Sequence, residues 1–210
     1  MSNIRGPKER IERALGVKLG LKAERGSSPK SAVLRKPYKP GQHGPGGKRR
    51  KSSLSDYGLQ LREKQKIKYT YGLSEKQLKE VFRKSIKSVI GTREKLIDIL
   101  ERRLDNVVFR IGFAPSRIVA RKMIIDRHIT VNNKKNSYPN YQVKVKDIIG
   151  ISPTSKEKGP FNKLPEILKK YDAPIWLSLD PSKMEGVVSS KPAEVDLPFD
   201  YNLIVEFYSR

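Results

Sequence analysis

The stretch from Gly112 to Asn133 reads GFAPSRIVARKMIIDRHITVNN and carries the most informative local pattern of the chain. Gly112 and Pro115 break a preceding helix, and Ser116 is placed to cap a new helix that runs to about Asp126. The residues that follow alternate between apolar and polar side chains, as a half-buried strand does. The stretch therefore predicts a turn, a short helix and the first strand of a β-hairpin.

The short helix carries its positive charge on one face. Arg117 and Arg121 are four residues apart and share a side of the helix, with Lys122 beside them. The other side is apolar and is expected to face a core; it consists of Val119, Met123 and Ile124. After a turn at 132–134, a second alternating run over 141–146 is expected to complete the hairpin. Such a unit suits the recognition of RNA shape and backbone, which requires no sequence-specific base contacts.

Three helices are predicted before this stretch. The stretch Leu54–Tyr57 offers an N-cap to a basic helix that carries Arg62, Lys64, Lys66 and Lys68. Ser74 and Gln77 form a capping box for the second helix, whose apolar stripe is Leu78, Val81, Phe82, Ser85, Ile86 and Val89 before Gly91 ends it. Thr92 caps the third helix, whose stripe is Leu96, Leu100, Leu104, Val107, Val108 and Ile111. Both stripes are expected in the core.

The net charge limits the function. Lys and Arg number 45 against 22 acidic residues, which gives +23. A charge of this size favours a polyanionic partner, because self-repulsion destabilises an isolated compact state. The absence of cysteine excludes disulfides, thiolate metal sites and cysteine nucleophiles. No apolar run approaches the roughly 18 residues of a membrane span.

The charge is unevenly distributed. Residues 1–54 carry +12, residues 55–110 and 111–150 carry +6 each, and residues 151–210 carry −1. Residues 1–54 are rich in Gly and Pro, apart from a short helix expected over Pro7–Leu15, so this segment is predicted to be a basic extension with little fold of its own. Gly46–Lys48 fails as a phosphate loop because Gln42 and Arg49 replace required residues. RNA should therefore contact the first 150 residues and largely avoid the last 60.

Six blocks of sequence resemble the S-four family of small-subunit ribosomal proteins. They are Gly41–Gly44, Leu54–Tyr57, Leu61–Lys66, Arg103–Val108, His128–Asn132 and Glu206–Arg210. The blocks occur in family order and with nearly the family spacing. The resemblance implies an α+β fold: a mostly helical domain of residues 55–99 and 190–210 that holds an RNA-binding module of residues 100–165 as an insertion. Residues 1–54 are then the extension, and residues 166–189 a connecting segment.

The resemblance also implies a function. The chain is expected to be a structural constituent of the small ribosomal subunit and a primary binder of 16S-type rRNA. An early role in assembly, a place near the mRNA entry path and a role in translational accuracy are implied as well. Its partners would be rRNA, neighbouring small-subunit proteins and nearby mRNA, without a membrane or a small-molecule substrate. The location would be the ribosome of the cytoplasm or of an organelle.

Candidate contact residues follow from charge and from the resemblance. The residues expected to bind RNA are polar or basic: Gln42, His43, Arg49, Arg50, Arg62, Lys64, Lys66, Arg103, Asn106, Arg110, Ser116, Arg117, Arg121, Lys122, Arg127, His128, Asn132 and Lys134. For Arg121, an ion pair with Asp105 or Asp126 is the alternative. Residues in the non-basic part are expected to meet a basic neighbouring protein: Trp176, Asp180 and Glu185. For Trp176, burial in the core is the alternative.

Two departures from the family pattern have structural consequences. Many family members bind zinc through four N-terminal cysteines, where this chain has Glu9, Glu12, Gly26 and Ser31. We therefore expect no zinc site, and no other metal or cofactor. The hairpin turn has Asn133 where the family usually has Gly, and Asn tolerates the left-handed conformation better than most residues.

Enzymes are the rival class. The module also resembles the RNA-binding domain of some pseudouridine synthases and tyrosyl-tRNA synthetases, and Arg103–Asp105 superficially resembles a synthase catalytic segment. Asp105, however, continues a helical pattern and lacks the Thr-rich strand of that family. His43 and His128 are far apart in the sequence and have no acidic constellation around them. We therefore expect no enzyme, and the runner-up is a non-ribosomal RNA-binding regulator.

Overall fold

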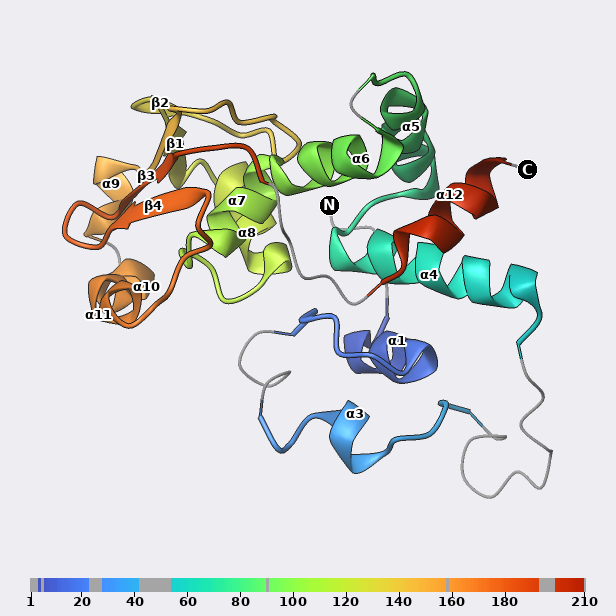
Figure 1. Ribbon diagram of the computed structural model, residues 1–210. Helices are drawn as coiled ribbons and strands as arrows, with labels where there is room; N and C mark the ends of the chain where they lie inside the picture. Colours follow the sequence, from blue (N-terminus) through green and yellow to red (C-terminus); the bar gives the residue numbers. More distant parts are fainter. Residues whose placement is uncertain are drawn as a thin grey trace. The chain divides into compact units, whose positions relative to one another are not determined.

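The structure is a computed structural model that describes residues 4, 6–22, 28–41, 54–89, 91–157, 159–192 and 199–209. The chain divides into two compact units, which are described separately. The first unit comprises Met1–Arg93 and Asp196–Arg210, and the second comprises Glu94–Val195. Helices dominate the first unit, and the second contains the sheet, as an α+β fold requires (Figure 1).

The first unit contains the helices α1 (Lys8–Leu15), α3 (Ala32–Arg35), α4 (Asp56–Thr70), α5 (Glu75–Ile86) and α12 (Tyr201–Ser209). The predicted caps are confirmed. The Ser55 hydroxyl accepts from the Gly58 N–H at the start of α4, and Ser74 and Gln77 form the capping box of α5. Local sequence therefore determines where these helices begin.

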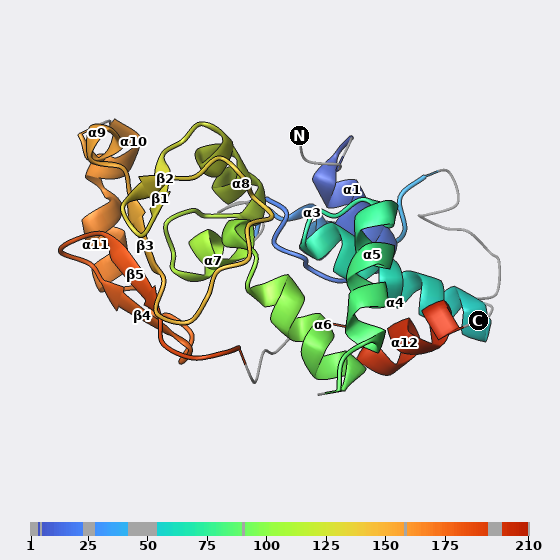
Figure 2. The same ribbon diagram turned by 90° about the horizontal axis from the view of Figure 1, so that it is seen from above.

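The last residues form a helix that packs on α4, as Figures 1 and 2 show. The backbone N–H of Asp200 donates to Glu63 Oε2 at 3.0 Å, just before α12 begins. Farther along, the ring of Tyr208 stacks on Phe82 of α5 with 4.7 Å between centroids, and the Lys64 ammonium lies 4.5 Å from the Phe207 ring centre. The C-terminal segment thus closes the helical unit.

The stripe of α5 is shorter than predicted. Leu78, Phe82 and Ser85 are buried, but the helix ends at Ile86, and both Ile86 and Val89 are exposed. Because Val89 lies beyond the helix, its spacing no longer places it on the buried face. The prediction that these last two residues are core is therefore wrong.

Part of the N-terminal extension packs against α4. Leu15, Leu19 and Leu21 form a small buried cluster against which Tyr69 of α4 packs. The buried Glu12 carboxylate accepts from the backbone N–H groups of Leu19 and Leu21 through the same oxygen, at 2.9 and 3.2 Å. The short helix expected over Pro7–Leu15 is present as α1 (Lys8–Leu15), and one buried carboxylate holds the chain that follows it.

The second unit is built on a five-stranded antiparallel sheet in the order β2-β1-β3-β5-β4. Its strands are β1 (Ile129–Val131), β2 (Lys134–Lys135), β3 (Ile148–Ile151), β4 (Leu177–Asp180) and β5 (Glu185–Val188). Its helices are α7 (Leu104–Arg110), α8 (Arg117–Ile125), α9 (Pro153–Lys156), α10 (Gly159–Asn162) and α11 (Leu164–Lys169), together with most of α6 (Thr92–Glu101). One core joins α7, α8, α10, α11 and the strands β1, β3, β4 and β5.

The hairpin turn is confirmed, but the second strand is not where the sequence placed it. Asn132 and Asn133 have φ values of 49° and 64°, the left-handed conformation expected at this turn. Strand β1 then pairs with the two residues of β2 and, on its other side, with β3. The run 141–146 is a loop instead, because its backbone forms hydrogen bonds with Arg102 rather than with β1.

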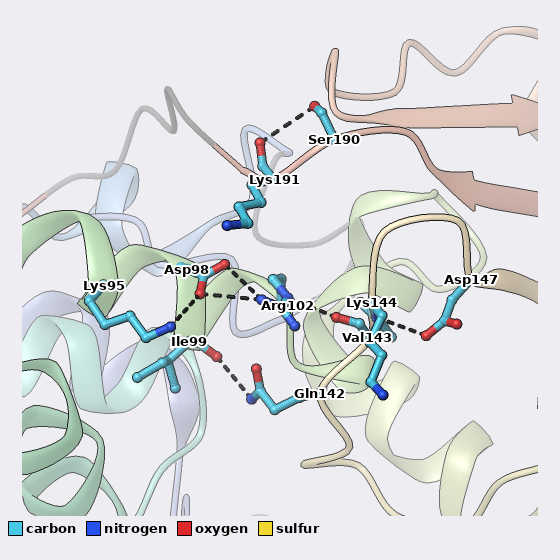
Figure 3. A network of polar contacts seen from close by, with 10 residues as sticks. All are labelled: Lys95, Asp98, Ile99, Arg102, Gln142, Val143, Lys144, Asp147, Ser190 and Lys191. Atoms are coloured by element: carbon cyan, nitrogen blue, oxygen red, sulfur yellow. Dashed lines mark hydrogen bonds and ion pairs between the residues drawn. The ribbon is translucent and has the colours of Figure 1, made fainter. Parts of the chain in front are cut away.

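This loop is fastened to the end of α6 (Figure 3). Arg102 Nε donates to the Val143 carbonyl at 2.7 Å, and the Val143 N–H donates back to the Arg102 carbonyl at 2.9 Å. Gln142 Nε2 donates to the Ile99 carbonyl at 3.1 Å. Asp98 fixes the Arg102 guanidinium at 3.1 Å. These contacts bind the alternating run as a loop rather than as a strand.

The third predicted helix is two helices. Arg103 is extended, with φ −67° and ψ 136°, and forms a bridge to Gln142, so α6 ends at Glu101 and α7 begins at Leu104. The apolar stripe nevertheless stays buried on both sides of the break. Spacing alone did not reveal the interruption, because the period resumes almost in phase.

Residues 166–189 do more than connect. They supply β4 and β5, which complete the sheet, and Trp176 lies in the core. A Cβ on Gly186 would lie 2.7 Å from Cδ1 of Ile111, so glycine allows β5 to pack directly on the end of α7. The expectation of a connecting segment is corrected accordingly. Within the described part of the chain, no helix is both long and apolar enough to cross a membrane.

Candidate nucleic-acid interface

A buried ion pair lies just before and within α7. Arg103 Nε and Nη2 donate to Asp105 Oδ1 and Oδ2 at 3.0 and 2.7 Å, and both residues are only 4% exposed. Nη1 of Arg121 lies 3.5 Å from the same carboxylate. A buried guanidinium requires a carboxylate partner of this kind. Arg103 is therefore buried and paired within the unit, and its contact with RNA stays a prediction.

A second buried carboxylate organises other residues of α7. Glu101, which is fully buried, accepts from Asn106 Nδ2 at 2.9 Å and from Arg110 Nε at 3.1 Å. Asn106 Oδ1 then accepts from Arg117 Nε at 2.8 Å, and the Arg117 guanidinium lies 4.5 Å from the ring centre of Phe109. Asn106 is itself completely buried, and its contact with RNA stays a prediction.

Helix α8 therefore turns its arginine face toward α7. Arg117 meets Asn106 and Arg121 meets Asp105, while Val119, expected on the core side, is exposed. Ser116 is buried, and its hydroxyl accepts from the Val119 N–H as the cap of α8. Ser116 thus has a structural role as a cap, and its contact with RNA stays a prediction. For Arg121, the geometry matches the alternative ion pair with Asp105.

The end of the β1–β2 hairpin is held by a third carboxylate. Asn132 Nδ2 donates to Asp147 Oδ1 at 2.9 Å, and the Lys144 N–H donates to Asp147 Oδ2 at 2.8 Å. Asn132 Oδ1 in turn accepts from the Ile148 N–H at 2.9 Å. Asp147 is buried and thereby joins the hairpin turn to the turn at 144–147.

Three lysines extend from these two joined turns. Lys134, Lys144 and Lys146 are all exposed, and we call them the hairpin-end cluster. Only Lys134 was predicted from the sequence. The other two were missed because they belong to the run that was interpreted as a strand; the turn-forming Asp147 after them was the available signal.

Beyond the hairpin end, Lys122 and Arg127 are exposed, as is Asn132. His128 is half-buried, with Nδ1 2.9 Å from the Ser155 hydroxyl and its ring edge-on to Phe161. The histidine therefore orients an internal contact at the start of β1. Tyr171 donates to the Arg110 carbonyl at 3.2 Å, and burial raises the pKa of its hydroxyl, so it stays a neutral donor at physiological pH.

The predicted contacts on α4 also have internal partners. Lys64 is buried and pairs with Glu75 at 2.7 Å, and its contact with RNA stays a prediction. Lys66 pairs with Glu63 at 2.6 Å, and Arg62 Nε donates to the Leu15 carbonyl at 3.0 Å. The remaining predicted contacts lie outside the described residues: Gln42, His43, Arg49 and Arg50.

Sequence comparison covers both units. Residues 3–101 match the Ribosomal protein S4/S9 N-terminal domain, and residues 102–149 match the S4 domain. The small ribosomal subunit protein uS4 of Roseiflexus castenholzii is 42% identical over 214 residues, which covers 100% of each chain. The chain belongs to the uS4 family. Membership of the uS4 family makes it a small-subunit ribosomal protein rather than an enzyme.

The uS4 match fits the geometry of the module. The S4-domain match over 102–149 contains α7, α8, the hairpin and Asp147. Two of the three residues expected at a protein interface, Asp180 and Glu185, lie outside it at partly exposed positions on β4 and β5. Trp176 is 5% exposed in the core, so burial, the alternative, is confirmed for this residue. No group of three possible metal ligands occurs among the described residues.

Proposed function

We propose that the chain is a primary binder of small-subunit rRNA and that the hairpin-end cluster is its main phosphate-binding surface. The observation that carries the proposal is the position of Lys134, Lys144 and Lys146 on two turns that Asp147 joins. A fixed backbone presents the three ammonium groups together. Phosphates of an RNA helix could then be bound with little further ordering of the protein.

The contacts between α7 and α8 support this surface from within. Asp105 and Asn106 of α7 bind Arg121 and Arg117 of α8, and α8 leads directly into β1. Arg110, Arg117 and Arg121 remain partly exposed at this junction, and we propose that their outer edges lie beside the RNA backbone. Lys122 and Arg127 extend the same cationic character past the end of α8.

The rRNA proposal predicts a specific loss. The double variant Lys134→Gln/Lys146→Gln should lower the slope of log affinity against log salt by about 2, because each lysine–phosphate contact contributes about 1. Filter binding of a naked 16S-type rRNA transcript measures this. The matched control, Lys163→Gln/Lys169→Gln, removes two exposed lysines from the α10–α11 region of the same unit. Equal slopes for the two doubles would refute a specific hairpin-end surface.

A primary binder should also act early in assembly. We propose that the chain binds naked rRNA without other proteins and so helps nucleate the subunit. A reconstitution in which proteins are added singly tests this order. Binding that required a previously bound protein would contradict the primary role.

The non-basic C-terminal part has a separate proposed role. Asp180 and Glu185 pair across β4 and β5, next to a turn whose backbone N–H groups donate to Asp180. We propose that this acidic end meets a basic neighbouring protein, near the mRNA entry path. Glu185→Lys should leave rRNA affinity unchanged or slightly raised, while it weakens that contact and alters misreading in a translation assay. A sharp loss of rRNA affinity with an intact fold would contradict it.

A further inference from the structure

A cleft in the first unit has no part in the function proposed above. It has a volume of about 390 Å³ and is lined by the C-terminal part of α1, by α3 and the residues after it, and by α4. That volume falls within the roughly 300–1,000 Å³ typical of small-molecule sites. Its charged lining residues are all basic: Arg13, Lys36, Lys39 and Arg62.

The two arginines of the cleft are held by backbone carbonyls and have no ion-pair partner among the described carboxylates. Arg13 Nε and Nη2 donate to the carbonyls of Lys36 and Tyr38, each at 3.1 Å. Arg62 donates from Nε and Nη2 to the carbonyl of Leu15. Neither arginine takes part in an ion pair with a described carboxylate. Carbonyl groups fix the two guanidinium groups without neutralising them, so the cleft favours an anion.

An aromatic surface lies beside these charges. The Arg13 guanidinium is 4.8 Å from the ring centre of Tyr38, which forms a stacked pair at the wall of the cleft. Lys36 and Lys39 are exposed on either side of Tyr38 in the sequence. Unstacked RNA bases bind to aromatic rings and to arginine planes, with cations for the adjoining phosphate.

We propose that this cleft binds one unstacked nucleotide of an RNA strand, with its phosphate at Lys36 and Lys39 and its base against the Arg13–Tyr38 pair. The inference rests on the proposed rRNA binding and adds a second, separate contact to it. A glycine that lines the cleft allows its walls to lie close together. Gly16 has a φ of +69°, and a Cβ there would lie 2.9 Å from Arg62 Nη2, so glycine permits the close approach of the α1 end to Arg62.

The test uses the full chain and naked 16S-type rRNA. Lys36→Gln/Lys39→Gln should lower the salt slope by about 1 to 2, since one or two phosphate contacts are lost. The control Lys76→Gln/Lys79→Gln removes the same charge from exposed positions on α5. Tyr38→Leu should weaken binding by about tenfold through lost stacking, whereas Tyr38→Phe should retain it. Circular dichroism shows whether each variant keeps its helices.

Crosslinking identifies the occupant. Irradiation of a complex with 4-thiouridine-substituted rRNA should yield a crosslinked peptide that contains Tyr38. If the wild-type chain binds rRNA but the cleft and control doubles behave alike and Tyr38 gives no crosslink, the cleft inference fails alone. If the wild-type chain binds no rRNA, the proposed function fails first. If labelled adenosine monophosphate binds by equilibrium dialysis and rRNA does not displace it, the cleft takes a free nucleotide, and the inference is overturned.

Discussion

The N-terminal segment and the S4 module use the same side chains in opposite ways. In the module, buried carboxylates hold arginines: Asp105 pairs with Arg103, and Glu101 with Arg110. In the N-terminal segment, the buried Glu12 carboxylate holds backbone N–H groups instead. Arg13 there donates to backbone carbonyls. The first arrangement neutralises the arginine, and the second leaves its charge available.

This difference separates structural arginines from those that can bind a polyanion. A paired, buried guanidinium has already exchanged water for a carboxylate, and breaking the pair leaves a buried charge without compensation. An arginine held only by carbonyls has its geometry fixed but its field unscreened by a counter-charge. Net charge alone does not distinguish the two cases. The partners of each guanidinium group do.

The largest expected effect is the loss of stability when the buried Asp105–Arg103 pair of the module is broken. Asp105→Asn should destabilise the second unit by about 3–5 kcal/mol, because Arg103 would remain buried without an anionic partner. Urea unfolding monitored in the module measures the loss. Asp126→Asn, at an exposed position just after α8, is the control and should change stability little.

The same variant can break the comparison. If Asp105→Asn left the stability unchanged but strongly lowered rRNA affinity, Arg103 and Arg121 would be RNA ligands after all. Their pairing with Asp105 would then be a resting arrangement of the free protein. The measured stability and affinity therefore decide between a structural and a binding role.

The next effect concerns Glu12 in the N-terminal segment. Glu12→Ala should destabilise the segment after α1 by about 2–3 kcal/mol, since two buried N–H groups lose a charged acceptor. Hydrogen exchange of the Leu19 and Leu21 amides measures this locally. Glu12→Gln keeps an acceptor oxygen and should recover most of the protection. Full loss in the glutamine variant would show that the negative charge, rather than the acceptor, holds the turn.

Sequence patterns predicted the features that depend on neighbouring residues. The caps at Ser55, Ser74 and Ser116 and the left-handed turn at Asn133 were predicted because each is determined within about four residues. The family resemblance added the α+β fold and the helix at the C-terminus, which local patterns left ambiguous. Both kinds of inference predicted which helices and strands form better than they predicted which elements pack together.

What the sequence could not predict were partners distant in the chain. The spacing of Arg117 and Arg121 shows that they share a face, but not that α7 would cover that face with Asn106 and Asp105. The run containing Val143 alternates like a strand, yet its backbone binds Arg102, which follows the end of α6. Trp176 was ambiguous for the same reason, because burial depends on strands that form only with the whole sheet.

The smallest expected effect on stability concerns Glu75, a carboxylate of the first unit that does pair with cations. Glu75 pairs with Lys64 and Lys68 and accepts from the Tyr208 hydroxyl at 3.3 Å. Burial acts to raise the pKa of Glu75, but the hydrogen bonds and charges of the two lysines outweigh it and lower the pKa. Burial, then the charge of Glu75 and the hydrogen bond to it, raise the pKa of Tyr208 above its usual 10.0.

The sign of the pH dependence follows from the raised pKa. Tyr208 contributes its full stabilisation below pH 10, where the tyrosine of the unfolded chain is also neutral. Above that pH the unfolded tyrosine ionises while the folded one resists, so the contribution falls as pH rises. Tyr208→Phe should cost up to about 1 kcal/mol at pH 7 for the lost hydrogen bond, and its stability should fall less than that of the wild type above pH 10. Urea unfolding at pH 7, 10 and 11 measures both, with Tyr138→Phe at an exposed position as control. Parallel pH curves for wild type and Tyr208→Phe would mean that α12 is held by Phe207 and the stacked ring of residue 208, and that the carboxylate of Glu75 serves its two lysines alone.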